Sequence, residues 1–182
     1  MNDTYRPDEL DQMGKNAFQK GKFAEAAEYF SAAAEGYRAL KQELQAAEMA
    51  NNLSVALLKA GDNEAALQAA QGTDVVFEMA GDTRRQAMAL GNTAAALESL
   101  NRIEEAIRVY ENADQLFKEI GEHELRAPVL QSLSTLQFKS GRSFEGLANL
   151  NAGFEEGGKT SLRRRFLKMF TDLPIKFLTK TK

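Results

Sequence analysis

A repeat of 40 residues runs through most of the chain and constrains its fold more than any other feature. Turn-like motifs recur with this spacing: KGKFAEAA around Gly21, AGDNEAAL around Gly61, LNRIEEAI around Asn101 and SGRSFEGL around Gly141. Two further turns are expected halfway between them, at Gly81 and Gly121. Glycine suits such points because helices commonly end on a residue in the left-handed conformation. Turns about every 20 residues predict a stack of helical hairpins.

Between the turns, apolar residues follow helical spacing and no segment alternates as a strand would, so we expect an all-α chain. Small residues occupy fixed places relative to the four main turns. Side chains this small let the two helices of a hairpin approach closely. The three sets, at seven before, five after and twelve after the turn, are Gly14, Ser54, Ala94 and Ser134; Ala26, Ala66, Ala106 and Gly146; and Ala33, Thr73, Ala113 and Gly153.

In this pattern the chain resembles the tetratricopeptide repeat (TPR) family. The stretch ALGNTAAALESLNRIEEAIRVYENADQLFKEIG, residues 89–121, carries the family's spacing of small and aromatic residues. The usual unit has about 34 residues, so the repeat here resembles a longer variety of about 40. The resemblance implies an α-α superhelix of four helical hairpins within residues 1–158, followed by a C-terminal helix.

Two units depart from the pattern. In the second, Ala70 stands where a large residue is usual and Asn63 where an aromatic residue is usual. In the fourth, Gln137 fills an apolar place. The fourth unit also has Pro128 early in its first helix, and proline is tolerated only in a first turn. That helix is therefore expected to begin near Arg126 or to be kinked.

The resemblance also implies where a ligand binds, because the first helix of each hairpin lines the concave side of such an array. The positions nine, six and two residues before each main turn would then face a partner peptide. The set has three lysines and no acid, which favours a peptide bearing carboxylates. If these positions are not merely solvated, the chain is a protein–protein interaction scaffold. They are Gln12, Lys15, Gln19, Asn52, Lys59, Asn92, Ser99, Ser132 and Lys139, with Val55, Ala95 and Thr135.

The last 24 residues, 159–182, differ from the rest in charge. They hold eight bases and one acid, so the net charge of −3 divides into +7 for this tail and −10 for residues 1–158. A helix over this tail would be amphipathic. It would cap the fourth unit or lie on an anionic membrane surface, which would make the chain a membrane-surface adaptor. Nucleic acid is a weaker candidate because the acidic body repels phosphate. The residues on its apolar face are Leu162, Phe166, Met169, Phe170 and Leu173.

Signals for catalysis are thin. GFEEGGKT at 153–160 matches the phosphate-loop pattern, but it continues a helix where a phosphate loop requires a preceding strand. His123 is the single histidine, it falls in a turn, and there is no cysteine. We therefore expect neither an enzyme nor a cofactor or metal. The N-terminus has no secretory leader and no apolar run is long enough to span a membrane, which predicts a cytoplasmic protein.

Overall fold

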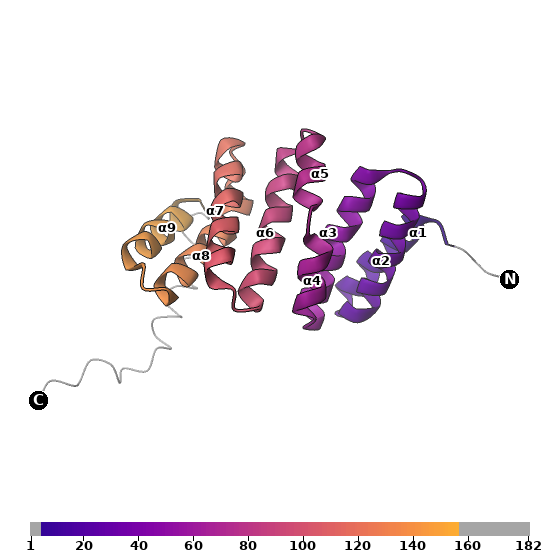
Figure 1. Ribbon diagram of the computed structural model, residues 1–182, viewed down its shortest axis with the longest axis horizontal. Helices are drawn as coiled ribbons and strands as arrows, with labels where there is room; N and C mark the ends of the chain where they lie inside the picture. The colour runs from indigo at the N-terminus through magenta and orange to yellow at the C-terminus, as the bar shows by residue number, and fades with distance from the viewer. Residues whose placement is uncertain (1–4, 157–182) are drawn as a thin grey trace, which may run out of the picture.

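The computed structural model describes residues 5–156, and helices account for most of this range. No strand occurs between residues 5 and 156, so the all-α prediction is confirmed. The helices stand side by side in chain order along one elongated array (Figure 1). They are α1 (Pro7–Gln19), α2 (Phe23–Ala39), α3 (Glu43–Ala60), α4 (Asn63–Ala70), α5 (Thr73–Met79), α6 (Thr83–Ser99), α7 (Ile103–Glu119), α8 (His123–Lys139) and α9 (Ser143–Glu156).

The turns fall where the repeat predicted them. At each turn a residue with positive φ ends the helix, and local backbone hydrogen bonds close the helix end. At Gly61 the backbone has φ +89°, and Asp62 N–H donates to the carbonyl of Leu57 at 3.0 Å. This bond closes a helix end in the Schellman pattern, which requires a left-handed residue. Positive φ recurs every 20 residues, at Gly21, Lys41, Gly61, Gly81, Asn101, Gly121 and Gly141. The turn at Lys41 had no glycine to signal it and was missed.

The second hairpin departs from the prediction of one continuous second helix. Its second half is broken into α4 and α5 at Gln71 and Gly72, and Gly72 adopts φ +79°. The Thr73 hydroxyl donates to the carbonyl of Ala70 at 2.7 Å and closes the break. Glycine permits this conformation at little cost. Beyond the break, Phe77 is fully buried.

The first helix of the fourth hairpin begins earlier than predicted. It starts at His123 rather than near Arg126, which makes Pro128 its sixth residue. Proline cannot donate a hydrogen bond to the carbonyl of Glu124 four residues before it. The ring of Pro128 is exposed, so it does not disturb the packed side of α8.

The core lies between the helices of adjacent hairpins, and the small residues allow close approach as predicted. Gly14 is buried on α1, where a Cβ atom would lie 2.7 Å from Cε1 of Phe30 on α2. Gly146 on α9 likewise faces the carbonyl oxygen of Ser134 on α8, at 3.2 Å from a built Cβ atom. Large apolar side chains fill the layers between hairpins, with Ile107 and Leu130 fully buried.

Candidate peptide-binding groove

A hollow lies between the first helices of hairpins one and two, and four of the predicted ligand positions line it. Its volume is about 210 Å³, and Lys15 and Gln19 of α1 face Asn52 and Val55 of α3 across it. The remaining lining residues are Phe18 and Phe30, whose rings make part of the wall apolar. The structure therefore brings these four predicted positions together.

A second hollow of about 250 Å³ lies between α6 and α8, in hairpins three and four. Asn92 and Ser132, both predicted ligand positions, line it together with rings from α7. Apolar side chains supply most of the rest of its wall. The full lining is Met88, Gly91, Asn92, Tyr110, Phe117, Leu125, Pro128, Val129 and Ser132.

The residue nine places after each main turn explains where the hollows form. Phe30 and Tyr110 occupy this place in hairpins one and three, and each ring belongs to the hollow beside its hairpin. In the second hairpin the place is held by Ala70, which is fully buried. There α3 packs against α6 more closely than α1 does against α3 or α6 against α8. The middle of the array, where this place holds a small side chain, is thus closed, and the first helices pack less closely on either side, where it holds a ring.

The closed middle is joined by polar contacts between α3 and α6. Nδ2 of Asn92 donates to Oδ1 of Asn51 at 2.9 Å, and Asn51 is buried. One end of the Asn92 amide, which is predicted to face a partner peptide, is therefore occupied within the protein. Asn51 was missed by sequence reasoning, because nothing in the repeat marks it as a contact between hairpins.

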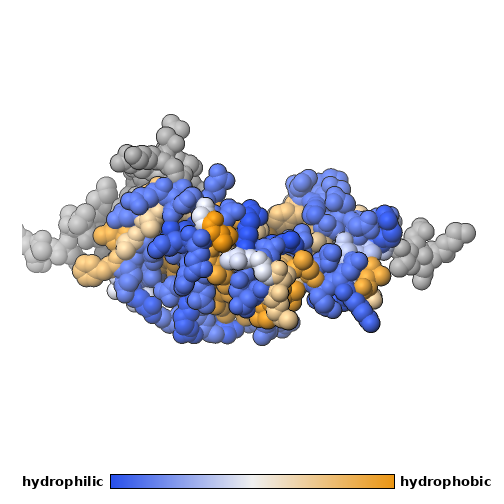
Figure 2. Space-filling model, turned by 90° about the horizontal axis from the view of Figure 1, so that it is seen from above, coloured by the Kyte–Doolittle hydropathy of each residue, from blue (hydrophilic) through white to orange (hydrophobic). Residues whose placement is uncertain are grey.

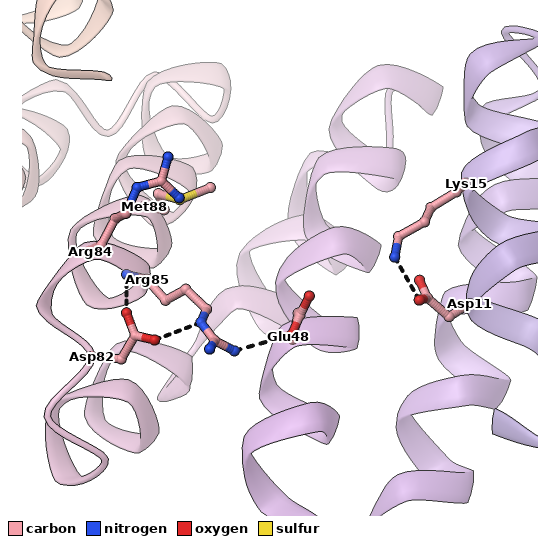
Figure 3. A network of polar contacts seen from close by, with 7 residues as sticks. All are labelled: Asp11, Lys15, Glu48, Asp82, Arg84, Arg85 and Met88. Carbon is pink, nitrogen blue, oxygen red and sulfur yellow. Dashed lines mark hydrogen bonds and ion pairs between the residues drawn. The ribbon is translucent and has the colours of Figure 1, made fainter. Parts of the chain in front are cut away.

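Arg85 makes the second connection across the middle (Figure 3). Its Nε donates to Oδ2 of Asp82 at 2.7 Å, one NH group donates to Oε2 of Glu48 at 3.1 Å, and the guanidinium lies 5.7 Å from the ring centre of Phe77. Asp82 also caps α6 by accepting from the backbone N–H of Arg85 at 2.9 Å. That backbone bond, with the Arg85 guanidinium beside it, lowers the pKa of the Asp82 carboxyl.

The predicted basic strip is partly neutralised by an acid that sequence reasoning missed. Nζ of Lys15 donates to Oδ2 of Asp11 at 2.6 Å, one helical turn away (Figure 3). Asp11 is buried, and within residues 5–156 its Oδ1 atom has no hydrogen-bond partner. Burial, followed by the nearby charge of Asp11, raises the pKa of the Tyr37 hydroxyl. Lys15 is thus one half of an ion pair.

The other predicted positions divide into occupied and available groups. The hydroxyl groups of Ser99 and Thr135 donate to carbonyls of their own helices. Lys59 and Lys139 are exposed and make no hydrogen bond or ion pair within the part of the chain that the structure describes. Gln12 is exposed at the surface of α1. Of the three lysines in the set, Lys59 and Lys139 are therefore the two that have no ion-pair partner among residues 5–156.

The weaker candidates have structural roles or lie outside the described range. His123 is exposed and its Nδ1 contacts a carboxylate oxygen of Glu156. Gly153, where the phosphate-loop match begins, is buried within α9, and the helix continues to Glu156. No cluster of metal-ligating side chains is found among residues 5–156, and no helix in that range has the length and apolar character to cross a membrane. The tail residues Leu162, Phe166, Met169, Phe170 and Leu173 lie outside the described residues.

Several solved structures share the fold of this chain. The apo form of RapI matches with a TM-score of 0.78 at 13% identity, over 94% of this chain and 61% of that one. Aspartyl phosphate phosphatase F from Bacillus subtilis matches with a TM-score of 0.78 at 15% identity, over 88% of this chain and 43% of that one. A putative kinesin light chain from Podosopora anserina, with nearly identical TPR-like repeats, matches with a TM-score of 0.53 at 13% identity, over 96% of this chain and 100% of that one.

The chain is therefore a TPR-like helical repeat protein, as its repeat predicted. It spans less than two thirds of the length of RapI and of the phosphatase. A model of the soluble NSF attachment protein (SNAP) family matches residues 9–170, and the chain belongs to this family. No curated protein sequence matches it. The resemblance to the longer repeat variety stays a prediction.

Proposed function

We propose that this protein is an interaction scaffold that binds an extended peptide of a partner protein along the face formed by α1, α3, α6 and α8. The observation that carries the proposal is the hollow in which Lys15, Gln19, Asn52 and Val55 meet over the rings of Phe18 and Phe30. Binding sites of this kind combine an apolar wall with a few polar groups that fix orientation.

The chemistry of the face suggests what the peptide carries. Two hollows with aromatic walls, separated by the closed middle, suit a peptide with two apolar side chains some distance apart. The amides of Gln19 and Asn52 are suited to the peptide backbone, since each has both donors and an acceptor. Lys59 and Lys139 would pair with carboxylates of the peptide, while Lys15 is already engaged by Asp11. The partner is therefore an apolar peptide with acidic residues at its edges.

The relatives agree with a scaffold role. The family description names an attachment protein, and the fold is shared with repeat proteins such as the putative kinesin light chain. One structural relative is named a phosphatase, but this chain spans 43% of that protein. We therefore propose binding rather than catalysis for this chain.

The test uses a library of random short peptides displayed on phage, selected on the full chain. A selected peptide is then measured against Val55→Arg, which places a charged side chain in the first hollow. The matched control is Val75→Arg on α5, where the side chain is 48% exposed and lines neither hollow. We expect Val55→Arg to weaken binding at least about tenfold, as loss of a buried anchor does, and Val75→Arg to leave it unchanged.

Charge is tested separately with Lys59→Glu. This substitution removes a charge-assisted bond and adds repulsion. It should weaken the binding of an acidic peptide by about 1–3 kcal/mol. Melting temperatures of all variants serve as the folding control. Selected peptides that bind Val55→Arg and Lys59→Glu as tightly as the unaltered chain would place recognition elsewhere on the protein.

A further inference from the structure

The end of the array formed by α9 exposes apolar side chains. Phe144 is 92% exposed and Leu147 is 51% exposed, and apolar residues are seen at this end of the molecule (Figure 2). The residue 40 positions before Leu147 is Ile107 of α7, which is fully buried. Ile107 belongs to a core cluster that includes Val129 and Leu133 of α8. Leu147 is thus the counterpart of a core residue, without the helix that would cover it among residues 5–156.

Phe144 adds a second departure from the repeat. The equivalent positions in the three earlier hairpins hold Ala24, Glu64 and Glu104, and all three are exposed. Glu104 makes an ion pair with Arg142 at the edge of the interface between hairpins three and four. The earlier hairpins have a small or acidic residue at this place, whereas the last hairpin has an exposed aromatic side chain. Exposed apolar patches of this kind are typical of surfaces that another element covers.

We propose that residues 163–173 of this chain form a helix that covers α9 as α8 covers α7. The repeat supplies the register. The helices α3, α6 and α8 begin at Glu43, Thr83 and His123, and the next member of the series is Arg163. Three of the apolar residues of this segment then fall in register with buried residues of α8. The pairs are Met169 with Val129, Phe170 with Leu130, and Leu173 with Leu133.

The chemistry of one contact pair supports this register. Arg126 of α8 donates to Asp114 of α7 at 2.6 Å, and both side chains are at least 80% buried. Forty residues later the same two places hold Phe166 and Phe154. Both members change together from a charged pair to an aromatic pair. A lone change would leave a ring against a charge, so the joint change is what a contact between the two residues requires.

The pairs at the earlier interfaces follow the same rule. Between hairpins one and two the places hold Ala34 and Ala46, which are both buried. Between hairpins two and three they hold Asp74 and Gln86, which are both polar. In each interface the two residues match in character, which extends the argument to the proposed contact of Phe154 with Phe166.

Two further observations set the extent of the covering helix. Pro174 follows Leu173 and disfavours a helical continuation, because proline restricts the residue before it. The family model continues past α9 to residue 170, so the family's sequence pattern includes most of the proposed segment. The segment also carries net positive charge towards an array whose net charge is −10, since the chain's total of −3 includes +7 from residues 159–182.

The contact is tested by cross-linking, for which the absence of native cysteine leaves a clean background. The variant Phe154→Cys/Phe166→Cys is treated with a short bismaleimide in the full chain. The matched control is Phe154→Cys/Lys168→Cys, because two residues along a helix turn the side chain to the other side. We expect an intramolecular cross-link in the first variant and little in the control. Equal yields in both, or a cross-linked dimer as the main product, would overturn the proposal.

A second test restores the charged pair of the preceding interface. Phe154→Asp and Phe166→Arg are made singly and together, and amide exchange is measured in α9. Each single variant should speed exchange there by about tenfold, as loss of a neighbouring element does in a repeat array. The double variant should recover most of the protection, whereas Phe154→Asp with Leu178→Arg, of equal charge, should not. Failure of the double variant to recover any protection would overturn the proposed register.

The variant Phe166→Arg also distinguishes this proposal from the alternative hypothesis that the tail binds a membrane. Phe166→Arg is assayed by co-sedimentation with vesicles containing phosphatidylserine. The proposal expects faster exchange in α9 in the absence of vesicles. Unchanged exchange in α9, together with lost co-sedimentation, would show that the tail serves a lipid surface and would overturn the proposal. Neither result bears on the hollow between α1 and α3, so failure here is distinguishable from failure of the proposed function.

Discussion

Two glycines in equivalent helices should respond in opposite directions to the same substitution. Gly14 of α1 and Gly91 of α6 both lie inside helices and away from their ends. Alanine is more favourable than glycine in a helix interior by about 1 kcal/mol, so both substitutions gain this amount from helix propensity. What differs is the space that the new methyl group meets.

At Gly14 the added Cβ would lie 2.7 Å from Cε1 and 2.8 Å from Cδ1 of Phe30, whose side chain is 3% exposed. Ordinary contact between carbon atoms is about 3.5–4.0 Å, so the ring must move by roughly 1 Å. Overpacking of this kind costs about 1–3 kcal/mol. The ring borders the first hollow, which gives it room to shift and favours the lower half of this range. We expect Gly14→Ala to destabilise the protein by up to about 1 kcal/mol, which is the lower half of the overpacking cost minus the helix gain.

At Gly91 a Cβ would meet no heavy atom within 4 Å. Gly91→Ala therefore keeps the full helix gain and should stabilise the protein by about 1 kcal/mol. The assay is urea denaturation followed by circular dichroism, with the change in midpoint read at constant slope. In a chain of this size, 1 kcal/mol shifts the melting temperature by about 2–4 °C.

A double variant identifies the contact responsible. In the Phe30→Leu background the ring edge is gone, so Gly14→Ala should lose most of its penalty, and the difference gives the coupling energy. If Gly14→Ala stabilises the chain as much as Gly91→Ala does, the close approach of α1 to α2 is not rigid and this reasoning is wrong.

Substitutions at two further residues, Asp82 and Arg126, test the polar contacts between hairpins. Asp82→Ala should cost about 1–2 kcal/mol through loss of the α6 cap and of the Arg85 pair, while Asp82→Asn keeps the cap and should cost less. Because the folded-state pKa of Asp82 is lowered, its contribution is present above its ordinary value of 3.8 and is lost as pH falls through the lower folded value. Urea melts of Asp82→Asn should therefore show a flatter loss of stability below pH 3.8 than the unaltered chain. Arg126→Met leaves Asp114 and Glu156 without their shared cation and should cost about 2–4 kcal/mol, since one partner of a largely buried pair is removed. A thermal melt checks this, and an unchanged melting temperature would mean that the pair is solvated.

The repeat and its turns were predicted from sequence because they depend on neighbouring residues. A left-handed residue closes a helix end through bonds to carbonyls in the preceding turn, and glycine signals most of these places. The periodic small residues likewise predicted that the two helices of each hairpin approach closely. Lys41 shows the limit of the signal, since its turn has φ +58° without a glycine.

Only the tertiary structure decided which of the predicted ligand positions share a site. Each hollow is lined by residues of three helices, including the ring of Phe30 or Tyr110, and the middle between them is closed where the equivalent place holds Ala70. The pairing of Lys15 with Asp11 could have been predicted from their spacing of four residues on one helix. The burial of Asp11, which fixes the pair, could not be predicted in this way. Contacts between hairpins join residues about 40 apart, as Asn51 and Asn92 do, and their partners are set by how closely two helices approach. That distance is a property of the packed layer as a whole, and no local stretch of sequence encodes it.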